Sequence, residues 1–104
     1  MTKTTKIRVR GDTTRTEVLA LVAHPMKGAG ITNSQEPDQS RPDYIEYMWF
    51  SLNDITVAEV FLSPNIAANP LTAIALEETI PGDRVSVQWS DSRGDKGGAV
   101  TAIK

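Results

Sequence analysis

The sequence predicts an all-β fold in which about seven short strands form a β-sandwich. Three observations lead to this prediction. Apolar residues alternate with polar ones in several short segments, as they do in strands that bury one face. Between those segments stand pairs of Gly, Pro, Asn and Asp, the residues that favour tight turns. No segment shows a convincing helical spacing of apolar residues.

Two strands are predicted before Pro25. In the segment KIRVRG, Ile7 and Val9 alternate with basic residues, which is typical of a strand half buried at a sheet surface. Residues 16–24, TEVLALVAH, form a nearly continuous apolar run, and their valines and the flanking Gly and Pro favour a central strand over a helix. The polar residues 27–43 then predict a surface loop. Because this loop is longer than the usual connection in a compact domain, we expect it to have a function or to be mobile.

The next two strands form a predicted hairpin. Residues 44–52, YIEYMWFSL, and 55–62, ITVAEVFL, are joined at Asn53-Asp54, a strong signal for a two-residue turn. Such a turn sets the register of the two strands. We expect the core side to pair Leu52 with Ile55, Phe50 with Val57 and Met48 with Glu59, and the outer side to pair Trp49 with Ala58 and Tyr47 with Val60.

The predicted outer side therefore carries Tyr47, Trp49, Ala58 and Val60, an unusual composition for a sheet face in water. Two explanations stay open. Trp and Tyr are enriched in protein interfaces, so the face is a candidate contact surface for a partner. Alternatively, the loop of residues 27–43 covers it.

Three further strands are predicted after residue 70. In the middle one, Val85, Val87 and Trp89 share a face, and we expect Trp89 to fill the core in place of an antibody disulfide. The predicted strands are residues 71–78, 84–91 and 99–104, with turns at residues 81–83 and 92–98. Seven strands with turns at this spacing predict an immunoglobulin-like sandwich.

Length and composition narrow the possible functions. The chain has 104 residues, which favours one domain, residues 1–104, and its formal charge of −2 gives no reason to expect nucleic acid or an anionic membrane as partner. Cysteine is absent, so disulfides, thiolate ligands and thiol nucleophiles are excluded. The N-terminal residues lack the apolar region of a signal peptide, so we expect a cytoplasmic protein or export by another route.

Arg93-Gly94-Asp95 spells the tripeptide that integrins recognise, and it falls in the predicted last hairpin loop. A free-standing adhesion or ligand-binding module is therefore an alternative function. A tripeptide is weak support, however, and Gly with Asp is ordinary turn chemistry, so the turn is favoured. Together with Asp83 and Asp91, Asp95 lacks the ligand density and terminal glutamate of a calcium loop.

His24 is the single histidine of the chain and stands at the end of a predicted buried strand. Without a second His or Cys to complete a ligand set, a hydrogen-bonded histidine that positions the following loop is favoured over a metal ligand. Ser63 has no glycine elbow and no evident base nearby in the sequence. We therefore predict no catalytic residue, no cofactor and no metal.

Several motifs, taken in order, resemble one family. The segment AHPM, the block Ser-Pro-x-x-x-x-Asn-Pro at residues 63–70 and the ending GDRVSVQWSDSRGD follow one another at the spacing seen in SoxZ, a subunit of the SoxYZ sulfur-carrier complex of bacterial thiosulfate oxidation. The resemblance covers nearly the whole chain from Ile7 onward, but not the loop of residues 27–43. The motif positions are His24, Pro25, Met26, Ser63, Pro64, Asn69, Pro70, Gly82, Asp83, Trp89, Asp91, Gly94 and Asp95.

This resemblance implies an immunoglobulin-like subunit that pairs with SoxY and, through it, meets other Sox enzymes. SoxY carries the sulfur substrate on a cysteine in a Gly-Gly-Cys-Gly-Gly arm, whereas SoxZ carries no catalytic group, which agrees with the absence of cysteine here. SoxY carries a twin-arginine export signal, and SoxZ travels with it. The resemblance therefore implies a periplasmic location for a chain that has no signal peptide of its own.

The segment SPNIAANPL, residues 63–71, is too rich in proline for a helix and too poor in bulky side chains for a strand. In a sandwich of this strand order, we expect it to cross from one sheet to the other. Pro64 and Pro70 would stiffen the crossing, and Asn65 and Asn69 would bond to neighbouring backbone groups. Its lack of charge predicts that either the domain or a partner covers it.

Overall fold

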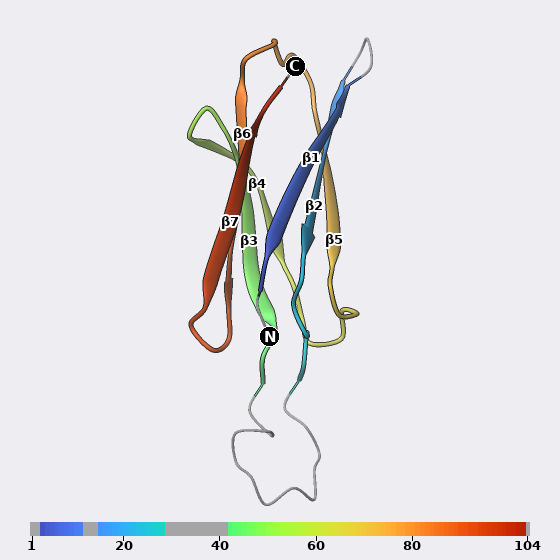
Figure 1. Ribbon diagram of the computed structural model, residues 1–104, viewed down its shortest axis with the longest axis vertical. Helices are drawn as coiled ribbons and strands as arrows, with labels where there is room; N and C mark the ends of the chain where they lie inside the picture. Colours follow the sequence, from blue (N-terminus) through green and yellow to red (C-terminus); the bar gives the residue numbers. More distant parts are fainter. Residues whose placement is uncertain (1–2, 12–14, 29–41, 104) are drawn as a thin grey trace, which may run out of the picture.

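The computed structural model describes residues 3–11, 15–28 and 42–103. In these residues the chain forms seven strands and no helix, arranged as two antiparallel sheets that face each other (Figure 1). The first sheet has the order β1-β2-β5 and the second has the order β4-β3-β6-β7. The strands are β1 (Thr5–Gly11), β2 (Thr16–Val22), β3 (Ile45–Leu52), β4 (Ile55–Phe61), β5 (Leu71–Leu76), β6 (Arg84–Asp91) and β7 (Lys96–Ala102). The predicted β-sandwich is confirmed.

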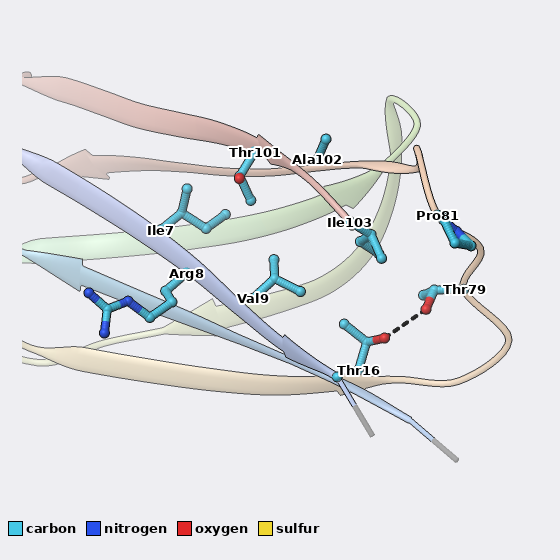
Figure 2. Close-up of a pocket in the computed structure, with 10 residues that line it drawn as sticks. Ile7, Arg8, Val9, Thr16, Thr79, Pro81, Thr101, Ala102 and Ile103 are labelled. Carbon is cyan, nitrogen blue, oxygen red and sulfur yellow. Dashed lines mark hydrogen bonds between the residues drawn. The ribbon is translucent and has the colours of Figure 1, made fainter. Parts of the chain in front are cut away.

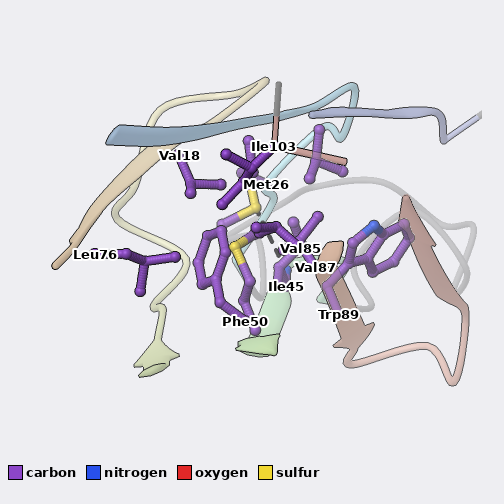
Figure 3. Close-up of a cluster of buried hydrophobic side chains, with 12 residues drawn as sticks. Val18, Met26, Ile45, Phe50, Leu76, Val85, Val87, Trp89 and Ile103 are labelled. Atoms are coloured by element: carbon purple, nitrogen blue, oxygen red, sulfur yellow. Dashed lines mark hydrogen bonds between the residues drawn. The ribbon is translucent and has the colours of Figure 1, made fainter. Parts of the chain in front are cut away.

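The core lies between the inner faces of the two sheets (Figure 3). Val18, Ala20 and Val22 of β2 point into it from the first sheet, which explains why this central strand reads as a nearly continuous apolar run. From the second sheet, β6 contributes Val85, Val87 and Trp89, the three residues expected to share a face. The indole of Trp89 is among the largest fully buried side chains and fills the core as predicted.

The last strand begins at Lys96, three residues before the predicted start at residue 99. The predicted turn over residues 92–98 is therefore confirmed for residues 92–95 and wrong for residues 96–98. The reason is a close approach between Trp89 and its cross-strand partner Gly97. A Cβ atom at Gly97 would lie 2.5 Å from Cζ2 of the Trp89 indole. Gly97 is therefore a strand residue that leaves room for the indole against the β7 backbone, and not a turn residue.

The β3–β4 hairpin turns at Asn53 and Asp54, whose φ angles of 50° and 71° fit a two-residue turn. The pairing of Leu52 with Ile55 is confirmed. Beyond it, Ser51 pairs with Thr56 but Phe50 pairs with Ala58, so β4 advances two residues where β3 advances one. This β-bulge moves every later pair by one position from the predicted register.

Residues 63–70 connect β4 in one sheet to β5 in the other, so the predicted crossing is confirmed. Pro70 is buried and Pro64 is half-buried, but the other residues of the crossing are exposed. The expectation that the domain covers this segment was therefore wrong, and cover by a partner stays a prediction. The crossing lies at the end of the sandwich where β2 and β6 finish and β3 and β7 begin (Figure 1). We call this the loop end.

Candidate functional site

Three aromatic side chains are stacked on the outside of β3 and β4. The Tyr47 ring lies 4.9 Å from the ring of Trp49, at an interplanar angle of 22°. It lies 5.0 Å from the ring of Phe61, at 27°. Phe61 is 75% exposed, which is high for a large apolar residue. We call Tyr47, Trp49 and Phe61 the aromatic face.

Two of the four residues predicted on this outer side are placed there. Met48 and Phe50 are fully buried, so their neighbours Tyr47 and Trp49 point outward as expected. The placement of Ala58 and Val60 was wrong, because both are half-buried and pack against the core. The bulge is the cause, since it sets Glu59 opposite Trp49 and Phe61 opposite Tyr47.

The sequence did not lead us to expect Phe61 on the outer side, although the position of Glu59 in the predicted register argued against that register. The predicted register placed Glu59, the single charged residue of β4, on the core side opposite Met48. A charge in that position would need a buried partner. Placing Glu59 outward instead would have turned Ala58 and Val60 inward and brought Phe61 to the surface.

The aromatic face holds little unsatisfied polarity. Desolvation by its surroundings raises the pKa of Tyr47, and a hydrogen bond to Glu59 with the charge of that carboxylate raises it further. The phenol therefore stays protonated and engages the carboxylate of Glu59. Stacked aromatic rings beside a hydrogen-bonded carboxylate have the composition of a protein contact surface.

A second group of functional candidates lies at the loop end and consists of Lys3, His24, Asp43, Asp91 and Asp95, which we call the polar cluster. His24 is fully buried after β2, and its Nε2 lies 2.9 Å from Oδ2 of Asp91. The backbone N–H of Met26 donates to Nδ1 of His24 at 3.1 Å. Because an amide can only donate, Nδ1 carries no proton and Nε2–H donates to Asp91. His24 thus has the hydrogen-bonded, loop-positioning arrangement expected of it.

Lys3 is the cation of the polar cluster. Its Nζ lies 2.8 Å from a carboxylate oxygen of each of Asp43, Asp91 and Asp95. Burial alone would lower the pKa of Lys3, but hydrogen bonds to the three carboxylates outweigh it and raise the pKa well above its usual range. Burial likewise would raise the pKa of Asp91, but hydrogen bonds from Lys3, His24 and the Asp95 amide hold that pKa below its usual range.

The structure brings together potential metal-binding groups that the sequence analysis did not connect. The ligand atoms of His24, Asp43 and Asp91 all lie within 4.8 Å of one another. The ammonium of Lys3 lies beside them and contacts both aspartates. Because Lys3 and Asp91 are separated by 88 positions, no local sequence pattern points to this arrangement.

Most of the motif positions lie at or near the loop end, whereas Gly82 and Asp83 lie at the opposite end of the sandwich. Asn69 donates its backbone N–H to the carbonyl of His24 at 2.8 Å and accepts the N–H of His24 on Oδ1 at 3.0 Å. It does so with a φ of 57°, in the left-handed region that Asn tolerates. Pro64 of the same motif lies close to Gly28, where a Cβ atom would be 3.0 Å from the proline ring. The crossing is therefore fixed to the segment that follows β2.

The Arg93-Gly94-Asp95 tripeptide forms a turn around Asp91. Oδ1 of Asp91 accepts the backbone N–H groups of Arg93 at 3.0 Å and Asp95 at 2.8 Å. Gly94 has a φ of 86°, which a glycine adopts without strain. The carboxylate of Asp95 is itself bound to Lys3. These contacts account for the tripeptide as turn chemistry, as the sequence favoured.

The opposite end of the sandwich contains the turn of Asp83 and a pocket. Asp83 accepts the N–H of Ile80 on Oδ2 and an amide hydrogen of Asn53 on Oδ1, both at 3.0 Å, and these bonds lower its pKa. The pocket has a volume of about 560 Å³ and is lined mainly by threonine and aliphatic side chains of β1, β7 and the Ile80 turn (Figure 2). No motif position lies in its lining, so it does not extend the candidate site.

Comparison with known proteins identifies one family. The model of the family described as "Sulphur oxidation protein SoxZ" matches residues 4–102. No curated protein sequence matches the chain. The crystal structure of hypothetical protein PH1083 from Pyrococcus horikoshii OT3 is similar with a TM-score of 0.66 and 12% sequence identity, covering 98% of this chain and 88% of that chain. An identity this low shows the shared fold alone.

The described residues contain no helix long and apolar enough to span a membrane. The family match extends over nearly the whole chain and includes every motif position described above. The chain therefore belongs to the SoxZ family of sulphur oxidation proteins.

Proposed function

We propose that this protein is the non-catalytic subunit of a SoxYZ-type heterodimer and supports the sulfur substrate that its partner carries on a cysteine. The observation that carries the proposal is the SoxZ family match over residues 4–102. The chain has no cysteine, so a covalently held sulfur substrate requires a thiol from another subunit. A division of labour between a carrier subunit and a supporting subunit follows from that requirement.

The polar cluster supports a non-catalytic role. Both ring nitrogens of His24 are engaged, one by Met26 and the other by Asp91. Within the part of the chain that the structure describes, every buried side-chain nitrogen or oxygen has a hydrogen-bond partner. A general base needs a free lone pair within reach of substrate, and His24 has none to offer while these bonds persist.

The aromatic face is the surface on which we place the partner. A protein does not usually leave three stacked aromatic rings partly in water unless another chain covers them. Aromatic anchors also dominate the energetics of many interfaces. The alternative cover is the loop of residues 27–43, of which residues 29–41 lie outside the described part of the chain. Substitution of Trp49 separates these two explanations.

The proposed location is the periplasm, with export driven by the twin-arginine signal of a SoxY partner. Support comes from the family alone. Expression of the chain in a bacterial host with and without the signal-bearing partner tests the proposal. We expect the chain in the periplasmic fraction when the complete partner is present, and in the cytoplasm when the partner's signal is deleted. Equal distribution in both cases would contradict export with a partner.

The experiment that tests the function is reconstitution with the SoxY-type protein of the same organism, identified by its Gly-Gly-Cys-Gly-Gly end. We expect the two purified chains to form a one-to-one complex in size-exclusion chromatography with light scattering. We also expect thiosulfate-dependent turnover of the reconstituted system to require both chains. Turnover by the partner without this chain, or no complex at micromolar concentrations, would overturn the proposal.

The same system tests whether His24 has a chemical role. Because both of its ring nitrogens are occupied, we expect His24→Ala to lower stability and to leave turnover of the assembled complex unchanged. The measurement is turnover at a temperature where circular dichroism shows the variant to be folded and bound. Loss of turnover in a folded, assembled complex would require a catalytic role for His24.

A further inference from the structure

The N-terminal residues 3–5 bond to three separate parts of the loop end. Lys3 binds the carboxylates of Asp43, Asp91 and Asp95. The carbonyl of Thr4 accepts the N–H of Ala23 at 2.8 Å. Lys3 and Thr4 precede β1, and Thr5 is its first residue. We call residues 3–5 the N-terminal strap.

The strap also reaches the core. Oγ1 of Thr5 accepts the indole Nε1–H of Trp89 at 2.8 Å. The ring of His24 meets the same indole edge-on, with a centroid distance of 5.6 Å and an interplanar angle of 88°. The strap is therefore connected to both residues of the buried His24–Trp89 pair. Thr5 bonds directly to the indole, and Lys3 bonds to Asp91, which accepts the hydrogen bond from His24.

Charge explains why the first residue of the strap is a lysine. Asp91 has a side chain that is 0% exposed and Asp43 one that is 11% exposed, whereas Asp95 is 58% exposed. Buried carboxylates are strongly destabilising when their partner is removed, because water no longer solvates them. Arg93 supplies a second, more distant positive charge, with Nε at 3.8 Å from Oδ2 of Asp43. Lys3 is thus the cation in direct contact with all three carboxylates.

We propose that the N-terminal strap is a latch, which Lys3 holds closed over His24 and Trp89. Release of Lys3 opens the loop end locally, while the two sheets stay folded. Local opening is possible because the strap contacts β6 near its end, at Trp89 and Asp91. The pairing of β3 with β6 continues away from the loop end as far as Leu52 and Val85. The latch is a property of the fold and does not depend on the proposed function.

The test is hydrogen exchange in the full chain with Lys3→Met, which removes the charge and keeps an unbranched side chain. Lys6→Met, on the exposed side of β1, is the matched control. The probes are the Trp89 indole N–H and the amides of Met26 and Asp95. The internal reference is the part of the β3–β6 pairing that lies away from the strap, from Phe50–Val87 to Leu52–Val85. We expect exchange at the three probes to become about tenfold faster or more in Lys3→Met, with the reference amides and the control variant unchanged.

Unchanged exchange at the three probes would overturn the latch, because Lys3 would then be dispensable for closing the loop end. An equal acceleration of the β3–β6 amides would also overturn it, because Lys3 would then support the whole fold and no local opening would exist. If Lys3→Met does not fold, Asp95→Asn provides a milder variant, since Asp95 is the most exposed of the three carboxylates. The same pattern of local acceleration is expected there, and its absence would count against the latch.

Discussion

The aromatic face and the polar cluster differ in how far their side chains are covered by this chain. In the polar cluster, Lys3, His24 and Asp91 satisfy one another inside the chain, and Asp91 has no exposed side-chain surface. On the aromatic face, the ring of Tyr47 stacks on those of Trp49 and Phe61, yet Phe61 remains 75% exposed. The difference teaches that the cluster completes contacts within this chain, whereas the face leaves apolar rings exposed for the partner that we propose there.

Substitutions in the two regions should therefore change two different quantities, the free energy of unfolding and the affinity for a partner. A change in the polar cluster should alter the free energy of unfolding, because it leaves a buried charge or polar atom without its partner. A change on the aromatic face should alter the affinity for a partner, because truncation of a ring removes apolar area that the proposed partner would bury. A variant that moved both properties together would break the comparison.

The largest effect is expected for Asp91→Ala. This substitution removes the hydrogen-bond acceptor of His24 and two backbone amides and one of the three carboxylates that bind Lys3. We expect a loss of about 3–5 kcal/mol in the free energy of unfolding, as for other broken buried ion pairs. Urea denaturation followed by circular dichroism measures it.

The control for that variant is Asp54→Ala, which breaks the exposed ion pair between Asp54 and Arg84 at the far end of the sandwich. Exposed pairs contribute about 0–1 kcal/mol, so this variant should stay close to the unchanged protein. Equal losses in the two variants would show that the polar cluster contributes no more than a surface pair.

The second effect is a dependence of stability on pH. Burial opposes ionisation of Asp91, but the hydrogen bonds from Lys3, His24 and the Asp95 amide hold its pKa in the folded chain below the usual value. The folded chain therefore binds the Asp91 proton more weakly than the unfolded chain. The stabilisation is present in full above the unfolded pKa of about 3.9, and it is lost as pH falls through the lower folded pKa.

Urea denaturation at a series of pH values between 7 and 2 tests this sign, with Asp91→Asn as the comparison. Asp83 also has a lowered pKa and contributes its own acid-dependent loss, which both proteins share. We expect a shallower loss of stability below about pH 4 in Asp91→Asn than in the unchanged protein. Identical acid dependence in the two proteins would contradict a lowered pKa of Asp91.

The third effect concerns Gly97, which lies beneath the Trp89 indole. A Cβ atom there would lie 2.5 Å from Cζ2 of the ring, so Gly97→Ala must displace either the indole or the β7 backbone. We expect it to cost about 1–3 kcal/mol, as other overpacked cores do. Gly11→Ala is the control, because the nearest atom to its Cβ, Oγ1 of Thr16, is 3.9 Å away. A thermal unfolding midpoint that falls equally in both variants would contradict the close packing of Trp89 on Gly97.

The strands and the tight hairpin turn could be predicted from sequence because both depend on neighbouring residues. Alternation in β6 placed Val85, Val87 and Trp89 on the core side, and Asn53-Asp54 specified the turn of β3 and β4. The bulge between the pairs Phe50–Ala58 and Ser51–Thr56 could not be predicted in the same way, because it depends on how β4 fits the rest of the sheet. That one irregularity replaced Ala58 and Val60 by Phe61 on the outer side.

The polar cluster was beyond sequence reasoning for a different reason. His24 was recognised as a hydrogen-bonded residue, but Lys3 and Asp43 carry no local signal that links them to it. The bond from Lys3 to Asp91 spans 88 positions, and the bond from Lys3 to Asp43 spans 40. Contacts of this kind are set by which strands become neighbours, a property of the whole topology.

The smallest change in the free energy of unfolding is expected on the aromatic face, where the main effect should be on binding. Truncation of a buried aromatic anchor commonly costs about 2 kcal/mol of binding energy, roughly a thirtyfold weakening. We therefore expect Trp49→Ala to weaken the complex with the SoxY-type partner by at least about tenfold. In the isolated chain the free energy of unfolding should change little, since Trp49 points away from the core. Leu71→Ala is the matched control, because Leu71 is an apolar residue of the first sheet that is 65% exposed.

The most direct test of the comparison combines two measurements on Trp49→Ala, calorimetric titration with the SoxY-type partner and thermal unfolding of the isolated chain. We predict that the dissociation constant rises at least about tenfold while the unfolding midpoint stays within about 2 °C of the unchanged protein. The contradicting result is a lower unfolding midpoint with an unchanged dissociation constant. In that case the aromatic face is covered by the chain's own residues and is not the surface that meets the partner.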